Sequence, residues 1–186
     1  GVIAVTADGS AMIEKEVVVA DLNEDGKFYY DEALVAAHKA YCKDGESGYV
    51  TTTSQYGLRV TKLWGTDSTN NLFFANGAGL SVNVGDTEVA AGDDLYASIN
   101  ADSVNYCDIK TSFDAKELKG KVGEKVNVTL TGFIGIEGGD PIALQGIKIG
   151  YWKDGAFVEL PGVVTDAKGA ASFTPAETGT FILTAN

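Results

Sequence analysis

Oxygen-bearing side chains recur at a regular spacing in one short stretch of the chain, ADLNEDGKFYYDEAL, from Ala20 to Leu34. With Asp21 counted as position 1, positions 1, 3, 5 and 12 are acidic or amide residues and position 6 is glycine. This spacing matches the twelve-residue EF-hand-type pattern by which a loop folds around Ca²⁺. The chemistry that these residue types suggest is therefore metal binding.

Each matching position has a physical reason. Ca²⁺ takes six to eight oxygen ligands, and Asp21, Asn23 and Asp25 are short side chains that can supply them. Lys27, at position 7, contributes only its backbone carbonyl, whereas Glu32 is long enough to reach back with both carboxylate oxygens. The glycine at position 6 permits the sharp turn. We therefore expect a calcium ion bound by Asp21, Asn23, Asp25, Lys27 and Glu32.

The alternative is a solvated acidic turn that matches the pattern by coincidence. Five constrained positions and three mutually repelling carboxylates favour calcium over that alternative. Tyr29, at position 9, offers no group expected to hold a water molecule, which lowers the expected affinity. The apolar run KEVVVA predicts that a strand enters the loop where a helix would stand in a calcium sensor, so the expected role is structural.

No other residues form a catalytic pattern. His38 is the single histidine and lies on the apolar face of a predicted helix, which indicates a packed side chain. Ser54 has no partner for nucleophilic catalysis, and the carboxylates show no acid/base pairing. The sequence therefore predicts a protein that is not an enzyme.

Two cysteines, Cys42 and Cys107, leave several chemistries open. They are compatible with a disulfide, with buried free thiols, or with half of a metal site. A disulfide is the interpretation that an extracellular setting favours.

The elements that must position these residues are predicted from apolar spacing and turn residues. Strands are expected at residues 2–7 and 12–20, followed by a helix over residues 30–43 and then by five further strands. One helix packed across a mixed sheet makes an α+β domain, which we place at residues 1–114.

After a polar, glycine-containing stretch near residue 115, the sequence shows strand signals only. Short strands with frequent turns over residues 115–186 predict an all-β, immunoglobulin-like sandwich. The expected fold class is therefore α+β followed by all-β, in two domains.

Composition and charge narrow the classes of partner. The 186-residue chain carries a net charge of −12, which argues against nucleic acid and anionic membrane as partners. No apolar run approaches the roughly 20 residues of a membrane span. We expect a fragment of an exported protein, monomeric and without membrane insertion.

Aromatic residues suggest one alternative binding surface. Trp64 and Trp152, if exposed beside polar groups, could stack on sugar rings. The alternation of apolar residues around both of them favours core packing instead.

Several motifs together carry a resemblance to a known family. The calcium loop running into DEALVAAH, followed by GYVTTTSQYGL, KLWG, NLFFANG and GDDLYASI, resembles a module of large surface proteins from Gram-positive, often gut-dwelling bacteria. That module is similar to the C-terminal domain of transcobalamin, has a β-grasp-like fold, and here carries a dockerin-like calcium loop. The remainder, ending VVTDAKGAASFTPAETGTFILTAN, is similar to bacterial immunoglobulin-like modules.

The resemblance implies a function in recognition. It predicts a non-catalytic part of a bacterial cell-surface or cell-wall protein, serving adhesion to or recognition of a host protein such as an immunoglobulin or another glycoprotein. Two alternatives remain: a carbohydrate-binding accessory module of an extracellular polysaccharide-degrading system, or a plain spacer. The resemblance to transcobalamin does not imply a corrinoid ligand, because no motif in this sequence marks a corrinoid-binding pocket. The sequence also does not identify a partner.

Overall fold

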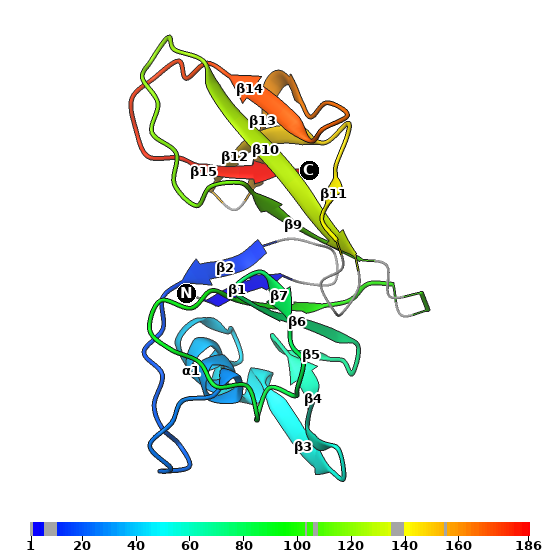
Figure 1. Ribbon diagram of the computed structural model, residues 1–186. Coiled ribbons are helices and arrows are strands. Elements are labelled where there is room, and N and C mark those ends of the chain that lie inside the picture. The colour runs from blue at the N-terminus through cyan, green and yellow to red at the C-terminus, as the bar shows by residue number, and fades with distance from the viewer. Residues whose placement is uncertain (1, 6–10, 103, 106–107, 135–139, 155) are drawn as a thin grey trace. The chain divides into compact units, whose positions relative to one another are not determined.

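The computed structural model describes residues 2–5, 11–102, 104–105, 108–134, 140–154 and 156–186. These residues form mainly β-sheet with one α-helix (Figure 1). The contacts divide the chain into two compact units, with the boundary between Asp108 and Ile109. Within the described part of the chain, no helix has the length and hydrophobicity of a membrane span.

The first unit contains α1 (Tyr30–Tyr41), the 3₁₀-helix η1 (Gly45–Gly48) and eight strands. The strands are β1 (Val2–Val5), β2 (Ala11–Lys15), β3 (Val50–Ser54), β4 (Gly57–Leu63), β5 (Thr66–Asp67), β6 (Asn71–Ala75), β7 (Ala78–Gly79) and β8 (Leu95–Ile99). They make a mixed sheet in the order β2-β1-β8-β6-β7, in which β1 and β8 are parallel, and a second sheet in the order β3-β4-β5.

Helix α1 forms where the sequence predicts a helix and ends slightly earlier than predicted. Acidic residues in its first turn and Lys39 in its last turn suit the helix dipole. Leu34, Ala37 and His38 share one face and have no exposed surface. That face is part of the core of the first unit, which continues onto β4 and β8 through Val60, Leu63, Leu95, Ala97 and Ile99.

The predicted strand over residues 12–20 is only partly correct. Strand β2 ends at Lys15, and residues 16–20 have no strand partner. Val17 and Val19 pack against the core while Val18 is 94% exposed. An apolar alternation can therefore bury every second side chain in an extended segment that is not paired in a sheet. As a result, the predicted calcium loop is entered by an irregular segment and not by a strand.

The second unit is all-β. Its strands are β9 (Ile109–Phe113), β10 (Val126–Ile134), β11 (Ile142–Ala143), β12 (Lys148–Lys153), β13 (Ala156–Val164), β14 (Ala170–Phe173) and β15 (Ile182–Ala185). One antiparallel sheet is built on β10, which pairs with β9, β11 and β14, and the other has the order β13-β12-β15.

Aromatic side chains connect these two sheets. The ring of Tyr151 on β12 meets Phe173 on β14 edge-on, with ring centroids 6.3 Å apart, and stacks on Phe181 at 4.8 Å. Val128, Leu130 and Ile149 are fully buried. Because β9 pairs with β10 over five residues, residues 109–113 belong to the second unit, and the boundary precedes the predicted one after residue 114.

Candidate metal centre

The loop from Asp21 to Glu32 makes its turn with two left-handed residues. Gly26 has a φ of 83°, as expected for the glycine at position 6, and Glu24 has a φ of 60°. Only glycine adopts that region without cost, and short polar residues such as aspartate and asparagine enter it more readily than glutamate. These two residues let the backbone curl so that its N–H groups face the side chains at the start of the loop.

The side chain of Asp21 accepts hydrogen bonds across the turn. One oxygen accepts the N–H of Asp25 at 3.2 Å and the other accepts the N–H of Gly26 at 2.8 Å. The Asn23 side-chain oxygen accepts the same Asp25 N–H at 3.1 Å. A carboxylate oxygen has two lone pairs, so one N–H bond to each oxygen of Asp21 leaves acceptor capacity for a cation.

Asp25 accepts three hydrogen bonds within the loop. Its Oδ1 accepts the N–H of Lys27 at 2.9 Å, and its Oδ2 accepts the hydroxyl of Tyr29 at 3.0 Å and the amide of Asn23 at 3.2 Å. Desolvation raises the pKa of Asp25, but these hydrogen bonds together lower it below its usual range. Asp25 is therefore a charged oxygen donor at neutral pH.

Tyr29 has a contact that the sequence reasoning missed. The sequence predicts only that Tyr29 does not hold a water molecule at position 9, and in the structure its hydroxyl donates to Asp25. The signal was present in the spacing, because residues four apart can meet at a turn that opens a helix. The hydroxyl orients a candidate ligand even though it is not itself expected to bind the ion.

Glu32 closes the loop from the helix side and is only 5% exposed. One carboxylate oxygen accepts the N–H of Leu22 at 2.6 Å, and the other accepts the N–H of Tyr29 at 2.9 Å. The second of these bonds satisfies a backbone donor at the helix start, as in a capping box. Glu32 thus links the second residue of the loop to the residue before α1.

A strap of residues from 83 to 89 supports the end of the loop and the beginning of α1. The N–H of Tyr30 donates to the carbonyl of Thr87 at 2.8 Å, and the N–H of Asp31 donates to that of Val84 at 3.0 Å. Lys27 forms an ion pair with Glu88 in the same strap. The geometry of the loop is therefore joined to a segment more than fifty residues further along the chain.

The donor set fits Ca²⁺ in kind. All five predicted ligands offer oxygen, and three of them are carboxylates, which are the ligands that a hard dication takes. Around the turn the structure brings together Asp21, Asn23 and Asp25, and it places Glu32 against the backbone at the start of the loop. Among the residues that the structure describes, no three Asp, Glu, His or Cys side chains converge on a common point as a metal-binding group.

His38 lies in the core and not in a site. Its Nε2 accepts the N–H of Trp64 at 2.9 Å, so the proton is on Nδ1, which lies 2.6 Å from the carbonyl of Leu34. The ring stacks on Trp64 with centroids 3.9 Å apart. Desolvation lowers the pKa of His38, which keeps it neutral at physiological pH. The prediction of a packed histidine agrees with this geometry.

The structure describes only one of the two cysteines, Cys42. Cys42 follows α1 and is half-buried. It packs closely against Gly48, because a Cβ atom added to Gly48 would lie only 2.5 Å from the Cys42 sulfur. Cys107 lies outside the described residues, so the predicted bridge stays a prediction.

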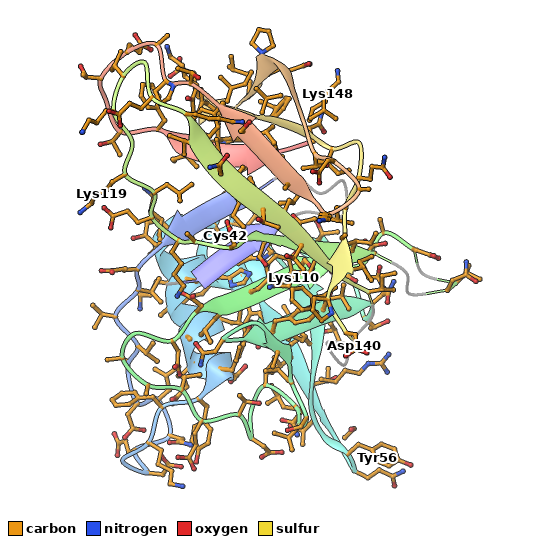
Figure 2. All side chains as sticks on the ribbon, turned by 45° about the horizontal axis from the view of Figure 1, so that its top comes forward. Cys42, Tyr56, Lys110, Lys119, Asp140 and Lys148 are labelled. Atoms are coloured by element: carbon orange, nitrogen blue, oxygen red, sulfur yellow. The ribbon has the colours of Figure 1, made fainter. Side chains whose placement is uncertain are left out.

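The aromatic residues proposed for sugar stacking are mostly covered. Trp64 is 6% exposed and its indole N–H points to the carbonyl of Ala97 at 3.4 Å, while Trp152 is half-buried. Among the described aromatic residues of the first unit, Phe28 and Tyr41 are partly exposed, and Tyr56 is 84% exposed at the tip of the β3–β4 hairpin (Figure 2). A tyrosine that stands out at a hairpin tip is not a stacking platform flanked by other rings.

Comparison with known proteins supplies no relative. No protein-family model, no curated protein and no solved structure matches this chain significantly.

Proposed function

We propose that this chain is a non-catalytic part of a bacterial cell-surface protein, that it holds a structural calcium ion in the loop from Asp21 to Glu32, and that it serves recognition of a host protein. The observation that carries the proposal is the oxygen donor set of the loop, with its turn at Gly26 and its closure by Glu32. The first unit would be a β-grasp-like domain and the second an immunoglobulin-like domain.

The side chains of Asp21, Asn23, Asp25 and Glu32 and the carbonyl of Lys27 would hold the ion. Its chemistry there would be charge neutralisation, because three carboxylates close together repel one another without a cation. The loop is joined by hydrogen bonds to the strap of residues 83–89, so binding would also stabilise that strap. A ligand that binds only the folded state stabilises it by mass action.

Thermal unfolding of the full chain tests the calcium site. We expect excess Ca²⁺ to raise the melting temperature of the first unit relative to a chelator, and the double substitution Asp21→Ala with Glu32→Ala to remove that difference. Asp67→Ala is the matched control, because Asp67 is an 89% exposed carboxylate outside the loop and should leave the calcium effect intact. Superimposable melting curves of the unsubstituted chain in calcium and in chelator would refute the site.

The recognition function is supported by the absence of a catalytic arrangement in the sequence and by the acidic net charge of −12. It is tested by affinity capture of proteins from host mucosal fluid, with the full chain immobilised in calcium. We expect a specific host protein to be retained by the calcium-loaded chain and lost when chelator is added. Retention of no host protein above the level of an unrelated acidic protein would favour a plain spacer.

The carbohydrate-binding alternative has less support. Trp64 is covered by the core, so it does not present a ring face to a sugar. Binding of the chain to a glycan array, together with its loss on Trp152→Ala, would revive that alternative.

A further inference from the structure

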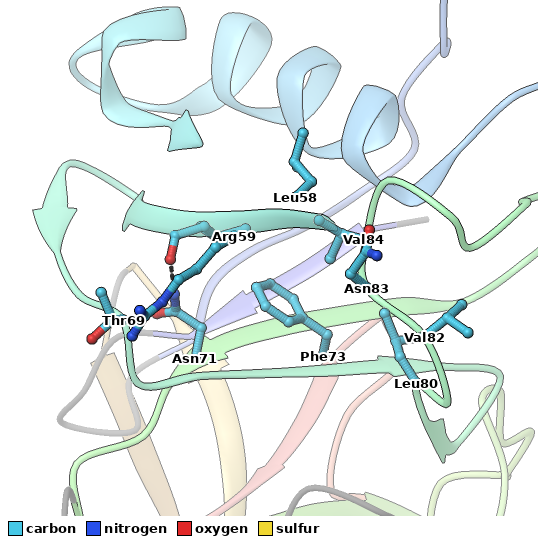
Figure 3. A pocket seen from close by; sticks show the side chains of 10 residues that line it. Leu58, Arg59, Thr69, Asn71, Phe73, Leu80, Val82, Asn83 and Val84 are labelled. Carbon is cyan, nitrogen blue, oxygen red and sulfur yellow. Dashed lines mark hydrogen bonds between the residues drawn. The ribbon is translucent and has the colours of Figure 1, made fainter. Parts of the chain in front are cut away.

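A small pocket in the first unit is lined by none of the five predicted calcium ligands. It has a volume of about 210 Å³ and is formed by β4, by β6 and by the segment from Leu80 to Val84 (Figure 3). Leu58 and Val60 line it from β4, and Phe73 lines it from β6. Because β4 and β6 belong to different sheets, the space between them is not closed by a backbone ladder.

The lining is divided into a polar end and an apolar end. Arg59, Thr69 and Asn71 lie together at one end in Figure 3, and Leu80, Val82 and Val84 lie at the other, with the Phe73 ring between them. Asn83 lies beside Val84 at the mainly apolar end, where its side-chain amide is hydrogen-bonded to Asp86 and to the N–H of Gly85. Val82 is 51% exposed, so the apolar end opens to solvent. A pocket with an apolar body and a few convergent polar groups is the usual form of a small-ligand site.

Asn71 leaves an acceptor unused at the polar end. Its side-chain nitrogen donates to the carbonyls of Val60 at 3.3 Å and Ser68 at 3.1 Å, which fixes the orientation of the amide. Its Oδ1 is buried and has no hydrogen-bond partner among the described residues. A buried acceptor of this kind is rare and favours any arrangement that brings it an N–H or O–H donor.

Arg59 supplies the charge of the pocket. It is the single arginine of a chain with a net charge of −12, it is exposed on β4, and no carboxylate pairs with it in the described part of the chain. A guanidinium carries five N–H donors in a planar fork. One edge of the fork can meet a carboxylate while another N–H donates to an acceptor beside it, such as the Asn71 Oδ1.

The volume limits the size of the apolar group. At roughly 30 Å³ for a water molecule, 210 Å³ corresponds to about seven waters, which is below the range of drug-sized pockets. A single aromatic ring or branched aliphatic group therefore fills it. The charged group of such a ligand would remain at the solvent side, next to Arg59.

We propose that this pocket binds an organic carboxylate, whose apolar group packs between Phe73, Leu80 and Val82 and whose carboxylate pairs with Arg59. In the complex, one guanidinium N–H would donate to the Asn71 Oδ1, which has no hydrogen-bond partner among the described residues, and this bond would position the guanidinium. The same chemistry is offered by a free aromatic acid and by the C-terminal residue of a peptide. The inference goes beyond the recognition function proposed above and requires neither calcium nor a host protein as the ligand of the pocket.

Chemical-shift titration of the ¹⁵N-labelled full chain tests this proposal. The probes are 3-phenylpropionate and N-acetylphenylalanine, each compared with its amide, which keeps the apolar group and removes the charge. We expect shifts at residues 58–60, 71–73 and 80–84, with affinity about five- to tenfold lower for the amides. Binding of N-acetylphenylalanine but not of 3-phenylpropionate would support the peptide source, and binding of both would support a free acid as sufficient.

Variants separate the charge from the apolar contact. Arg59→Gln is expected to weaken binding of the carboxylates about five- to tenfold and to leave binding of the amides unchanged. Val82→Ser is expected to weaken both. Lys62→Gln, on the same strand and outside the pocket, removes an equal charge and should change neither. The proposal is overturned if neither acid binds at 20 mM, if acids and amides bind equally, or if Lys62→Gln weakens binding as much as Arg59→Gln.

Discussion

Helix α1 carries a buried polar side chain near each end. The surroundings of these two side chains differ in how much hydrogen-bonding capacity remains for an added ion. Near its start, Glu32 accepts two backbone N–H groups but belongs to a loop whose other oxygens are exposed and retain lone pairs. Near its end, both ring nitrogens of His38 are used by backbone groups and its face is covered by Trp64. The first arrangement can still accept an ion, whereas the second has no group left for one. Unused hydrogen-bonding capacity, and not burial or residue type, separates the candidate site from the scaffold.

The largest effect is expected at the His38 end. Trp64→Ala removes a 6% exposed ring that stacks on His38, and we expect the free energy of unfolding to fall by about 3–5 kcal/mol. Urea denaturation followed by circular dichroism measures this loss. Tyr56→Ala removes an 84% exposed ring and should cost less than about 0.5 kcal/mol. Equal costs for the two variants would contradict the assignment of Trp64 to the core.

Substitution of Glu32 tests the buried polar side chain near the start of the helix. In chelator, Glu32→Ala leaves the N–H groups of Leu22 and Tyr29 without their acceptor and should cost about 1–2 kcal/mol. Glu32→Gln keeps one acceptor oxygen and should cost about half as much. Added calcium should widen the gap between each variant and the unsubstituted chain, because only the latter keeps the full ligand set. Glu46→Gln, at an exposed carboxylate, is the control, and a gap that is the same with and without calcium would argue against Glu32 as a ligand.

The pH dependence of stability tests whether His38 stays unprotonated in the folded state. Its pKa is lowered by desolvation, so the unfolded chain binds a proton near pH 6.5 while the folded chain does not. Stability is therefore fully present above pH 6.5 and falls as the pH drops below it, until the pH reaches the lowered folded pKa. The slope is at most about 1.4 kcal/mol per pH unit.

This measurement is simple because the chain contains a single histidine. Urea unfolding between pH 5 and pH 8 gives the slope, and a His38→Gln variant should flatten it. A stability that is constant across this range would show that His38 accepts a proton in the folded state.

The smallest effect is expected at Tyr29. Tyr29→Phe removes the hydroxyl that donates to Asp25, so the pKa of Asp25 should rise towards its usual range. The lowered pKa of Asp25 contributes stability that is present above the unfolded pKa and is lost as the pH falls through the folded one. NMR titration of the side-chain carboxyl of Asp25 measures the shift, and Tyr41→Phe, at a tyrosine distant in sequence from the loop, should leave it unchanged. No change in the pKa of Asp25 on Tyr29→Phe would mean that the hydroxyl bond does not form in solution.

Local patterns predicted much of the fold. Helix α1 follows from apolar residues spaced three and four apart, and most strands after it follow from short apolar runs between turn residues. The prediction that the strand continues beyond Lys15 was wrong. Alternation of apolar residues indicates which side chains are buried, but it does not indicate whether the backbone has a neighbouring strand to pair with. The predicted boundary after residue 114 follows β9, whereas the contacts divide the chain before β9, because this strand pairs with β10.

The sequence by itself determined the type and order of the oxygen donors from Asp21 to Glu32, since these are set by spacing within twelve residues. Tertiary structure alone decided that Glu32 is buried against Leu22, that the strap of residues 83–89 supports the loop, and that His38 meets Trp64. The pocket beside Arg59 also belongs to this second class, because it unites three segments that have no common pattern in the sequence. The physical reason is that periodicity and turn chemistry act between near neighbours, whereas hydrogen-bond partners and cavities depend on which distant segments the packing of the helix and the sheets brings together.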